Sequence, residues 1–234
     1  MPEIADLLPH ARNYRASAVR SLLESYYPTV YRIASALCGD QLATGEVIYR
    51  VMSRAIPAIP KWRDDSAADR WFYHYTVLET RRHDGIAASL DPLIAADPPN
   101  PEYSAFILAL RAMPAQHREA IILSHGEHLN PRYLGVAMDC SAEAAANHLR
   151  AATIYLQSIT GGQITPMLEI FSKCYHRLDL SPQTARPMIQ QRINRFLFPR
   201  RLKRCLLLLI IGAAIVAGLW RFFPLIPPGS TPRP

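Results

Sequence analysis

The chain has 234 residues, which is enough for one ordinary domain or two small ones. Half of the residues are hydrophobic and 19% are charged, so the chain can bury a core and is not disordered throughout. The ten glycines and twenty prolines follow no period, which excludes collagen-like and solenoid architectures. The four cysteines form no Cys-x-x-Cys pair, which argues against a disulfide scaffold and against a structural zinc site.

The formal net charge of +7 is concentrated in the C-terminal part of the chain. After Asp179 there are nine basic residues and no acidic one. Residues 1–179 carry seventeen basic and nineteen acidic residues, a net charge of −2. Most of the chain is therefore slightly acidic, and its basic isoelectric point is not evidence for a DNA-binding body.

Helical periodicity dominates the first third of the sequence, and no segment alternates as a strand would. Apolar residues step by three or four from Val19 to Leu37, and Gly39 predicts the end of this helix. A second helix is expected from Val47 to Pro57, and Asp65 or Ser66 can cap a third. The buried stripe of the third helix is expected to comprise Ala68, Trp71, Tyr75 and Leu78.

A second helical group follows residues 85–104, whose four prolines and small polar residues predict a linker. Helices are expected over residues 106–113, from Pro114 to about residue 126, and over residues 131–138. Ser141 is a natural N-cap for the next helix, because it ends the tight turn after residue 138. Two helices joined by such a short turn predict a helix-turn-helix unit.

The C-terminal region predicts a membrane anchor. Sixteen residues from Cys205 to Trp220 carry no charge, and the apolar run continues past Arg221 to Ile226. Residues 205–226 thus match a hydrocarbon core of roughly 30 Å, with a buried core helix as the alternative. Residues 161–204 read as an amphipathic, basic juxtamembrane segment. By the positive-inside rule, residues 1–204 are expected in the cytoplasm and residues 227–234 as a short outer tail.

Two blocks within residues 18–158 carry features that occur together in one family. The first block has Tyr27-Pro28-x-Val30-Tyr31, Gly39-Asp40, a helix end from Ala55 to Pro60, Lys61-Trp62 and Trp71-Phe72-Tyr73. The second block has Met113-Pro114, Arg118-Glu119, Gly126-Glu127, Leu129 and a turn at Cys140-Ser141. In both blocks and in their order, the sequence resembles bacterial RNA polymerase sigma factors of the extracytoplasmic-function group.

The resemblance implies an all-α protein of two small helical domains, with the single predicted transmembrane helix in addition. Residues 1–84 would form the promoter-melting domain, known as region 2, and residues 105–160 the promoter-reading domain, known as region 4. Such a protein binds core RNA polymerase and promoter DNA, and a regulatory partner such as an anti-sigma protein is expected. Together with the anchor, this predicts a single-pass protein of the bacterial inner membrane.

The same resemblance assigns three sets of binding residues. On the helix from about residue 42 to residue 55, the residues expected to bind polymerase are Glu46, Tyr49 and Arg50. The residues expected to face the melted DNA strand are Arg63, Arg70, Trp71, Tyr73, His74, Arg81 and Arg82. On the helix that would enter the major groove, the DNA-facing residues are Ser141, Glu143, Ala144, Asn147, His148 and Arg150. Asn147 is the best base reader, because an amide can pair bidentately with adenine.

The contact surfaces depart from the family pattern, which leaves a second function open. The polymerase-binding helix is usually acidic, whereas here Glu46 alone keeps that charge and Arg50 reverses it. The reading helix has Ala146 and His148 where lysine and arginine are usual. Because a protein that neutralises few phosphates binds DNA weakly, the alternative is a degenerate sigma fold. It would sequester a regulatory partner at the membrane without reading DNA.

Catalytic and metal-binding patterns are missing from the sequence. It has no nucleophile elbow, no P-loop and no paired carboxylates in a plausible pocket, so we expect no enzyme activity and no cofactor. His125 and His128 share a helix face, but no further ligand has suitable spacing. They are interpreted as ordinary surface histidines rather than as a metal site.

Overall fold

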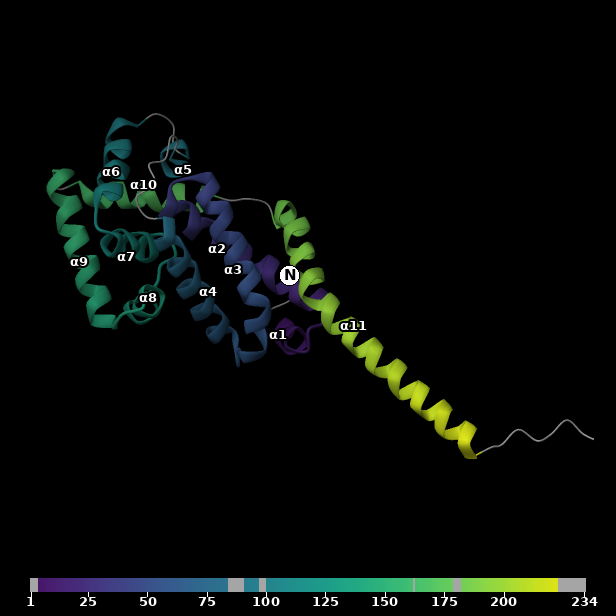
Figure 1. Cartoon of the computed structure of the whole chain (residues 1–234). Helices are drawn as coiled ribbons and strands as arrows, with labels where there is room; N and C mark the ends of the chain where they lie inside the picture. Colours follow the sequence, from purple (N-terminus) through teal and green to yellow (C-terminus); the bar gives the residue numbers. More distant parts are fainter. Residues whose placement is uncertain (1–3, 84–90, 97–99, 162, 179–181, 223–234) are drawn as a thin grey trace, which may run out of the picture. The chain divides into compact units, whose positions relative to one another are not determined.

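The computed structural model describes residues 4–83, 91–96, 100–161, 163–178 and 182–222 (Figure 1). Every regular element among these residues is a helix, which confirms the predicted all-α class. The chain forms two compact units, Met1–Ile193 and Asn194–Pro234.

The first helices of the chain are α1 Ile4–Arg12, α2 Ala16–Cys38, α3 Gln41–Ala58, η1 Ile59–Lys61, α4 Asp65–Thr80 and η2 Arg81–His83. Gly39 ends α2 in the left-handed conformation with φ of 69°, as predicted. The Asp40 carboxylate accepts a hydrogen bond from the Ala43 amide at 2.8 Å and caps α3. Asp64, rather than Asp65 or Ser66, caps α4 by accepting from the Ala67 amide.

The following helices are α5 Pro92–Ala95, α6 Pro101–Ala112, α7 Ala115–His125, α8 Pro131–Met138, α9 Ala142–Ile159 and α10 Ile164–Arg177. A short turn joins α8 to α9, and Asp139 enters it with a φ of 59°. Ser141 caps α9, because its hydroxyl oxygen accepts a hydrogen bond from the Ala144 amide at 3.1 Å. The predicted helix over residues 131–138 and the predicted Ser141 cap are confirmed.

The buried stripe of α4 differs from the predicted one. Ala68 and Phe72 are the buried members of its first turns, whereas Trp71, Tyr75 and Leu78 are half-buried. The reason is that α4 packs against α2 and α3 on one side and against α8 on another. The Phe72 ring stacks on Tyr26 of α2, with centroids 4.1 Å apart. The face of α4 that the sequence predicts to be buried is therefore not the most deeply buried face of this helix.

Both sequence blocks contribute to one hydrophobic core. Ile33 and Leu37 of α2 and Val77 of α4 belong to the same buried cluster as Ile107 of α6 and Leu123 of α7. Helix α10 closes this core with residues that include Phe171 and Tyr175. In its described residues, the predicted linker contains α5 and the beginning of α6, and Leu93 of α5 is fully buried.

The last helix, α11, runs from Pro182 to Phe222. The predicted anchor does not form a helix of its own, because its apolar residues continue the helix that carries Arg186, Arg192 and Arg195. Within the described part of the chain, no helix combines the length and the apolar character that crossing a membrane requires. The predicted transmembrane helix and the single-pass inner-membrane placement are therefore wrong. Residues 223–226 of that prediction and the tail 227–234 lie outside the described residues.

Candidate nucleic-acid and polymerase-binding surfaces

The outer face of α9 is open to solvent. Ala145, Ala152 and Leu156 point into the core and fix the rotation of the helix. Glu143, Asn147 and Arg150, which step by four and three residues, are consequently exposed. The Arg150 guanidinium donates a hydrogen bond to Oδ1 of Asn147 at 2.9 Å. This face thus presents an amide and a cation side by side, with a carboxylate one turn earlier.

The other predicted reading residues lie at the edges of this face. Ser141 is exposed and acts as the N-cap, whereas Ala144 and His148 are half-buried. The His148 ring lies 5.5 Å from that of His117 on α7, measured between centroids. The structure therefore exposes four of the six predicted residues and leaves the other two half-buried, with His148 beside His117 of α7.

An aromatic cluster surrounds Trp71 on α4. Its ring stacks on Tyr75, with centroids 4.4 Å apart, and lies 5.3 Å from the buried Trp62. His74 meets Tyr75 edge to face at 5.4 Å. Trp71 and His74 are both half-buried, so each is partly packed and partly accessible. Stacking on an unpaired base requires such an accessible aromatic face.

Two other residues of the predicted melting face have partners within the protein. Tyr73 packs against the shared core, and burial raises the pKa of its hydroxyl, with Glu127 as the next cause. The Arg70 guanidinium donates to the Ser66 hydroxyl, which in turn lies 2.8 Å from the Tyr133 hydroxyl of α8. Both predicted DNA contacts are thereby engaged where α4 packs on the second block.

Arg81 connects the two blocks directly. Its guanidinium donates two hydrogen bonds to the Glu119 carboxylate of α7, each 2.8 Å long, and a third to the Met138 carbonyl of α8 at 2.7 Å. The hydrogen bonds to Glu119 raise the pKa of Arg81. Such a bidentate pair holds a guanidinium in one orientation. The side chain predicted to follow a DNA phosphate is therefore occupied within the protein.

A buried carboxylate gathers three arginines at the end of α4. Glu79 is fully buried, and its oxygens lie 2.7 Å from Arg54, 3.2 Å from Arg82 and 3.9 Å from Arg50. This arrangement brings predicted polymerase-binding Arg50 next to predicted DNA-binding Arg82. Sequence reasoning missed Arg54 and Glu79. Arg54 follows Arg50 by one helical turn, a spacing that the sequence does display.

The exposed face of α3 carries Glu46, Tyr49 and Arg50. The Arg50 guanidinium donates to the Glu46 carboxylate, and this hydrogen bond lowers the pKa of Glu46. Nε2 of His83 lies 3.9 Å from the same carboxylate. Tyr49 is 40% exposed, and the Arg192 guanidinium of α11 lies 3.6 Å from the centre of its ring. The three predicted polymerase-binding residues therefore share one surface, to which α11 adds a cation.

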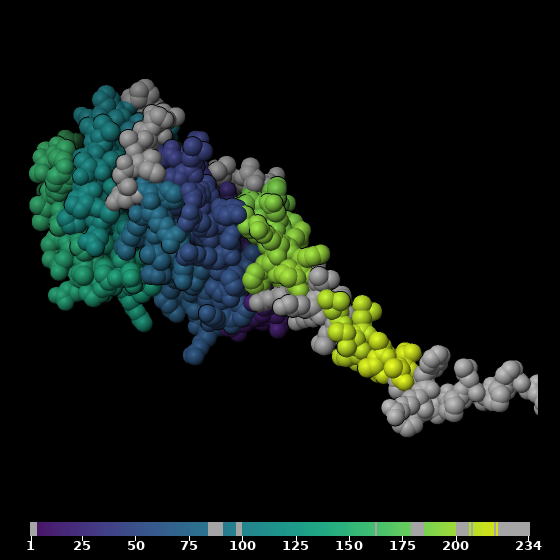
Figure 2. All heavy atoms as spheres, viewed as in Figure 1, coloured from purple at the N-terminus to yellow at the C-terminus, as the bar shows by residue number. Residues whose placement is uncertain are grey.

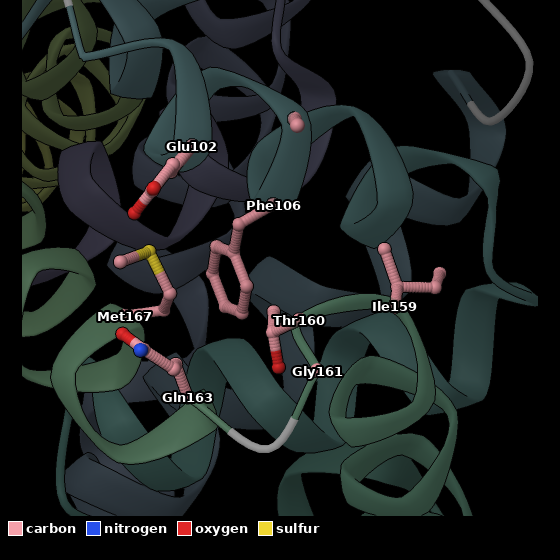
Figure 3. Close-up of a pocket in the computed structure, with 8 residues that line it drawn as sticks. Glu102, Phe106, Ile159, Thr160, Gly161, Gln163 and Met167 are labelled. Carbon is pink, nitrogen blue, oxygen red and sulfur yellow. The ribbon is translucent and has the colours of Figure 1, made fainter.

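Two hollows lie away from most of these residues. Arg63 lines a hollow of about 360 Å³ between α1 and the first turn of α4, together with Asp64 and Asp65. A second one, of about 330 Å³, lies between α6, the end of α9 and α10 (Figure 3). Phe106 and Met167 line its apolar side, and none of the predicted binding residues contributes to it. We assign no ligand to either hollow.

Comparisons of the chain with protein-family models, with curated proteins and with solved structures find no match. In the ranges that the structure describes, His, Cys, Asp and Glu side chains do not gather in groups of three that would hold a metal ion.

Proposed function

We propose that this chain is a sigma-factor-like transcription initiation protein that binds core RNA polymerase and promoter DNA, without catalytic chemistry of its own. The observation that carries the proposal is the α8–turn–α9 unit. Helix α9 begins at a capped turn and presents Asn147 and Arg150 on an exposed face. An exposed helix face with an amide and a guanidinium has the geometry and the donors that major-groove reading requires.

The first block supports the same proposal. Trp71 and His74 are half-buried side chains of the aromatic cluster of α4. Glu46, Tyr49 and Arg50 present a polar and aromatic surface on α3. A polymerase-binding surface and a base-stacking surface are what the resemblance to sigma factors implies for this block.

The test uses the full chain with bacterial core RNA polymerase and a genomic promoter library. We expect binding and transcripts with discrete start sites, and the Asn147→Ala/Arg150→Ala variant should lose the transcripts while still binding polymerase. Gln157→Ala is the matched control, because Gln157 is exposed near the other end of α9. Absence of polymerase binding, both in the wild type and in variants that uncover α3, would contradict the proposal.

The second candidate is a degenerate sigma fold that binds a regulatory protein and does not read DNA. It is favoured by the ion pairs of Arg81 with Glu119 and of Arg82 with Glu79. Each pair must be broken or shared before the arginine can neutralise a phosphate, which lowers DNA affinity. In this case neither polymerase binding nor transcripts are expected, and the Asn147→Ala/Arg150→Ala variant should behave like the wild type.

A further inference from the structure

The first turns of α11 belong to the unit Met1–Ile193 and are packed against its other helices. Ala185, Ile189 and Ile193 repeat every four residues, and they are 2%, 0% and 0% exposed. Residues at this spacing form a single stripe along a helix. The segment 182–193 is therefore docked by an aliphatic face rather than projecting into solvent.

Polar contacts identify what this segment lies on. Nε of Arg186 is 3.1 Å from Oε1 of Glu24, and the Gln190 amide oxygen accepts from Arg20. Both partners belong to α2, whereas Arg192 stacks on Tyr49 of α3. Figure 2 shows residues of the first turns of α11, in green, against blue residues of the same unit. The segment thus spans α2 and α3.

The aliphatic stripe accounts for most of this docking. The Arg186 side chain is 60% exposed, so solvent screens its ion pair with Glu24 and the pair contributes little. The fully buried Ile189 and Ile193 lose their whole contact with water on docking. Arg192 adds a cation–π contact, because its guanidinium lies within reach of the Tyr49 ring face.

We propose that the α2–α3 surface around Tyr49 is a docking surface that residues 182–193 occupy, and from which they withdraw before RNA polymerase binds α3. The inference rests on the proposed function, since it takes α3 as the polymerase-binding helix. Arg192 covers one face of a side chain assigned to the polymerase contact. Two partners cannot hold the same ring face, so the segment and the polymerase compete for it.

This competition has a measurable consequence. When only a fraction of the molecules has the surface uncovered, the apparent affinity for polymerase is lower by that fraction. A substitution that weakens the docking of residues 182–193 without touching α2 or α3 raises the uncovered fraction. Polymerase binding then becomes tighter, although the binding surface itself is unchanged.

The experiment compares two full-length variants that introduce the same charge into the same helix. Ile189→Asp places a carboxylate on the buried stripe, whereas Gln191→Asp places one on an exposed position. We expect Ile189→Asp to bind bacterial core polymerase at least tenfold more tightly than the wild type, and Gln191→Asp to bind as the wild type does. Amide hydrogen exchange of residues 185–193 should be faster in Ile189→Asp alone, which reports release of the segment.

Arg192→Ala gives a second route should Ile189→Asp fail to fold. It removes the contact with Tyr49 while leaving the aliphatic stripe intact, so a smaller gain in affinity for polymerase is expected. Arg192→Lys should restore part of the contact with the Tyr49 ring. If hydrogen exchange shows that the segment is released but polymerase binding is unchanged or weaker, the inference is overturned. The proposed function then still stands. If neither the wild type nor a released variant binds polymerase, both the inference and the proposed function are overturned.

Discussion

Arginine side chains that the family resemblance assigns to DNA are held here by carboxylates of the chain itself. Arg81 binds Glu119 through two hydrogen bonds, and Arg82 shares the buried Glu79 with Arg54. The carboxylates orient the guanidinium groups, but they also cancel charge that a phosphate would otherwise meet. This surface therefore differs from a strongly basic DNA-binding surface in two ways: it has fewer basic residues, and some of its arginines are paired with carboxylates of the chain itself.

His125 makes the stability of the fold depend on pH. Burial lowers its pKa from the ordinary value of 6.5, and His128 lowers it further. The unfolded chain therefore takes up this proton at a higher pH than the folded chain does. The stability that the neutral His125 side chain contributes is fully present at pH values above its pKa in the unfolded chain. It is lost as the pH falls through its pKa in the folded chain. We expect the free energy of unfolding to decrease as the pH is lowered from about 7.5 to below 6.

Urea unfolding at several pH values measures this effect. His125→Gln should flatten the pH dependence below pH 6.5, because the uncharged side chain binds no proton in either state. Gln116→Asn is the control, since Gln116 is exposed on the same helix and its replacement removes no titratable group. A profile that His125→Gln does not change would show that other groups cause it.

At the scale of single helices, the N-cap of α9 fixes where the reading helix begins. Ser141→Ala removes the oxygen that accepts from the Ala144 amide at 3.1 Å, leaving that amide without its cap. We expect a loss of about 1 kcal/mol in the free energy of unfolding. The first turn of α9, which carries Glu143 and Ala144, should also exchange its amide protons faster.

Chemical denaturation and hydrogen exchange check this prediction. Ser158→Ala is the matched control, because Ser158 lies on the same helix but donates its hydroxyl to the Tyr155 carbonyl rather than capping an end. Its replacement should change stability far less than Ser141→Ala. Equal losses in the two variants would contradict the assignment of Ser141 as the N-cap.

The helices that the sequence predicts well are those with local signals at both ends. Helix α8 begins at Pro131, and Ser141 caps α9 two residues after Asp139, which has the left-handed conformation. The stripe of α4 was predicted out of phase because it depends on two partners, α2 and α8, that lie far away in sequence. Helix α1 was not predicted, since nine residues with Pro9 inside give little periodicity.

The prediction of a separate helix for the apolar run after residue 205 is wrong for another reason. Its composition alone predicted a separate span, whereas in the structure it is the second part of α11, which begins at Pro182. Contacts between different helices also limit how much of the candidate site the sequence predicts. The exposed residues Glu143, Asn147 and Arg150 follow from helical spacing, but the pairing of Glu79 with Arg54 depends on how α3 and α4 pack.

At the scale of the whole unit Met1–Ile193, long-range ion pairs hold the two sequence blocks together. Arg32 of α2 lies 3.1 Å from Glu127, which also accepts a hydrogen bond from the Tyr175 hydroxyl of α10 at 2.9 Å. Arg81 and Glu119 form the second connection. Under the proposed function, the two blocks contact two separate promoter elements. The strength of these connections therefore decides how readily the blocks separate.

A double-mutant cycle on Arg81 and Glu119 measures that strength. Glu119 is 2% exposed, so Arg81→Ala leaves a carboxylate out of water without its partner, and we expect a loss of about 1–3 kcal/mol in the free energy of unfolding. The double variant Arg81→Ala/Glu119→Ala should lose less than the sum of the two single variants, because no unpaired charge remains. The same cycle on Arg50 and Glu46, an exposed pair within α3, should give a much smaller coupling. Equal couplings for the two pairs would mean that Arg81 and Glu119 do not connect the blocks.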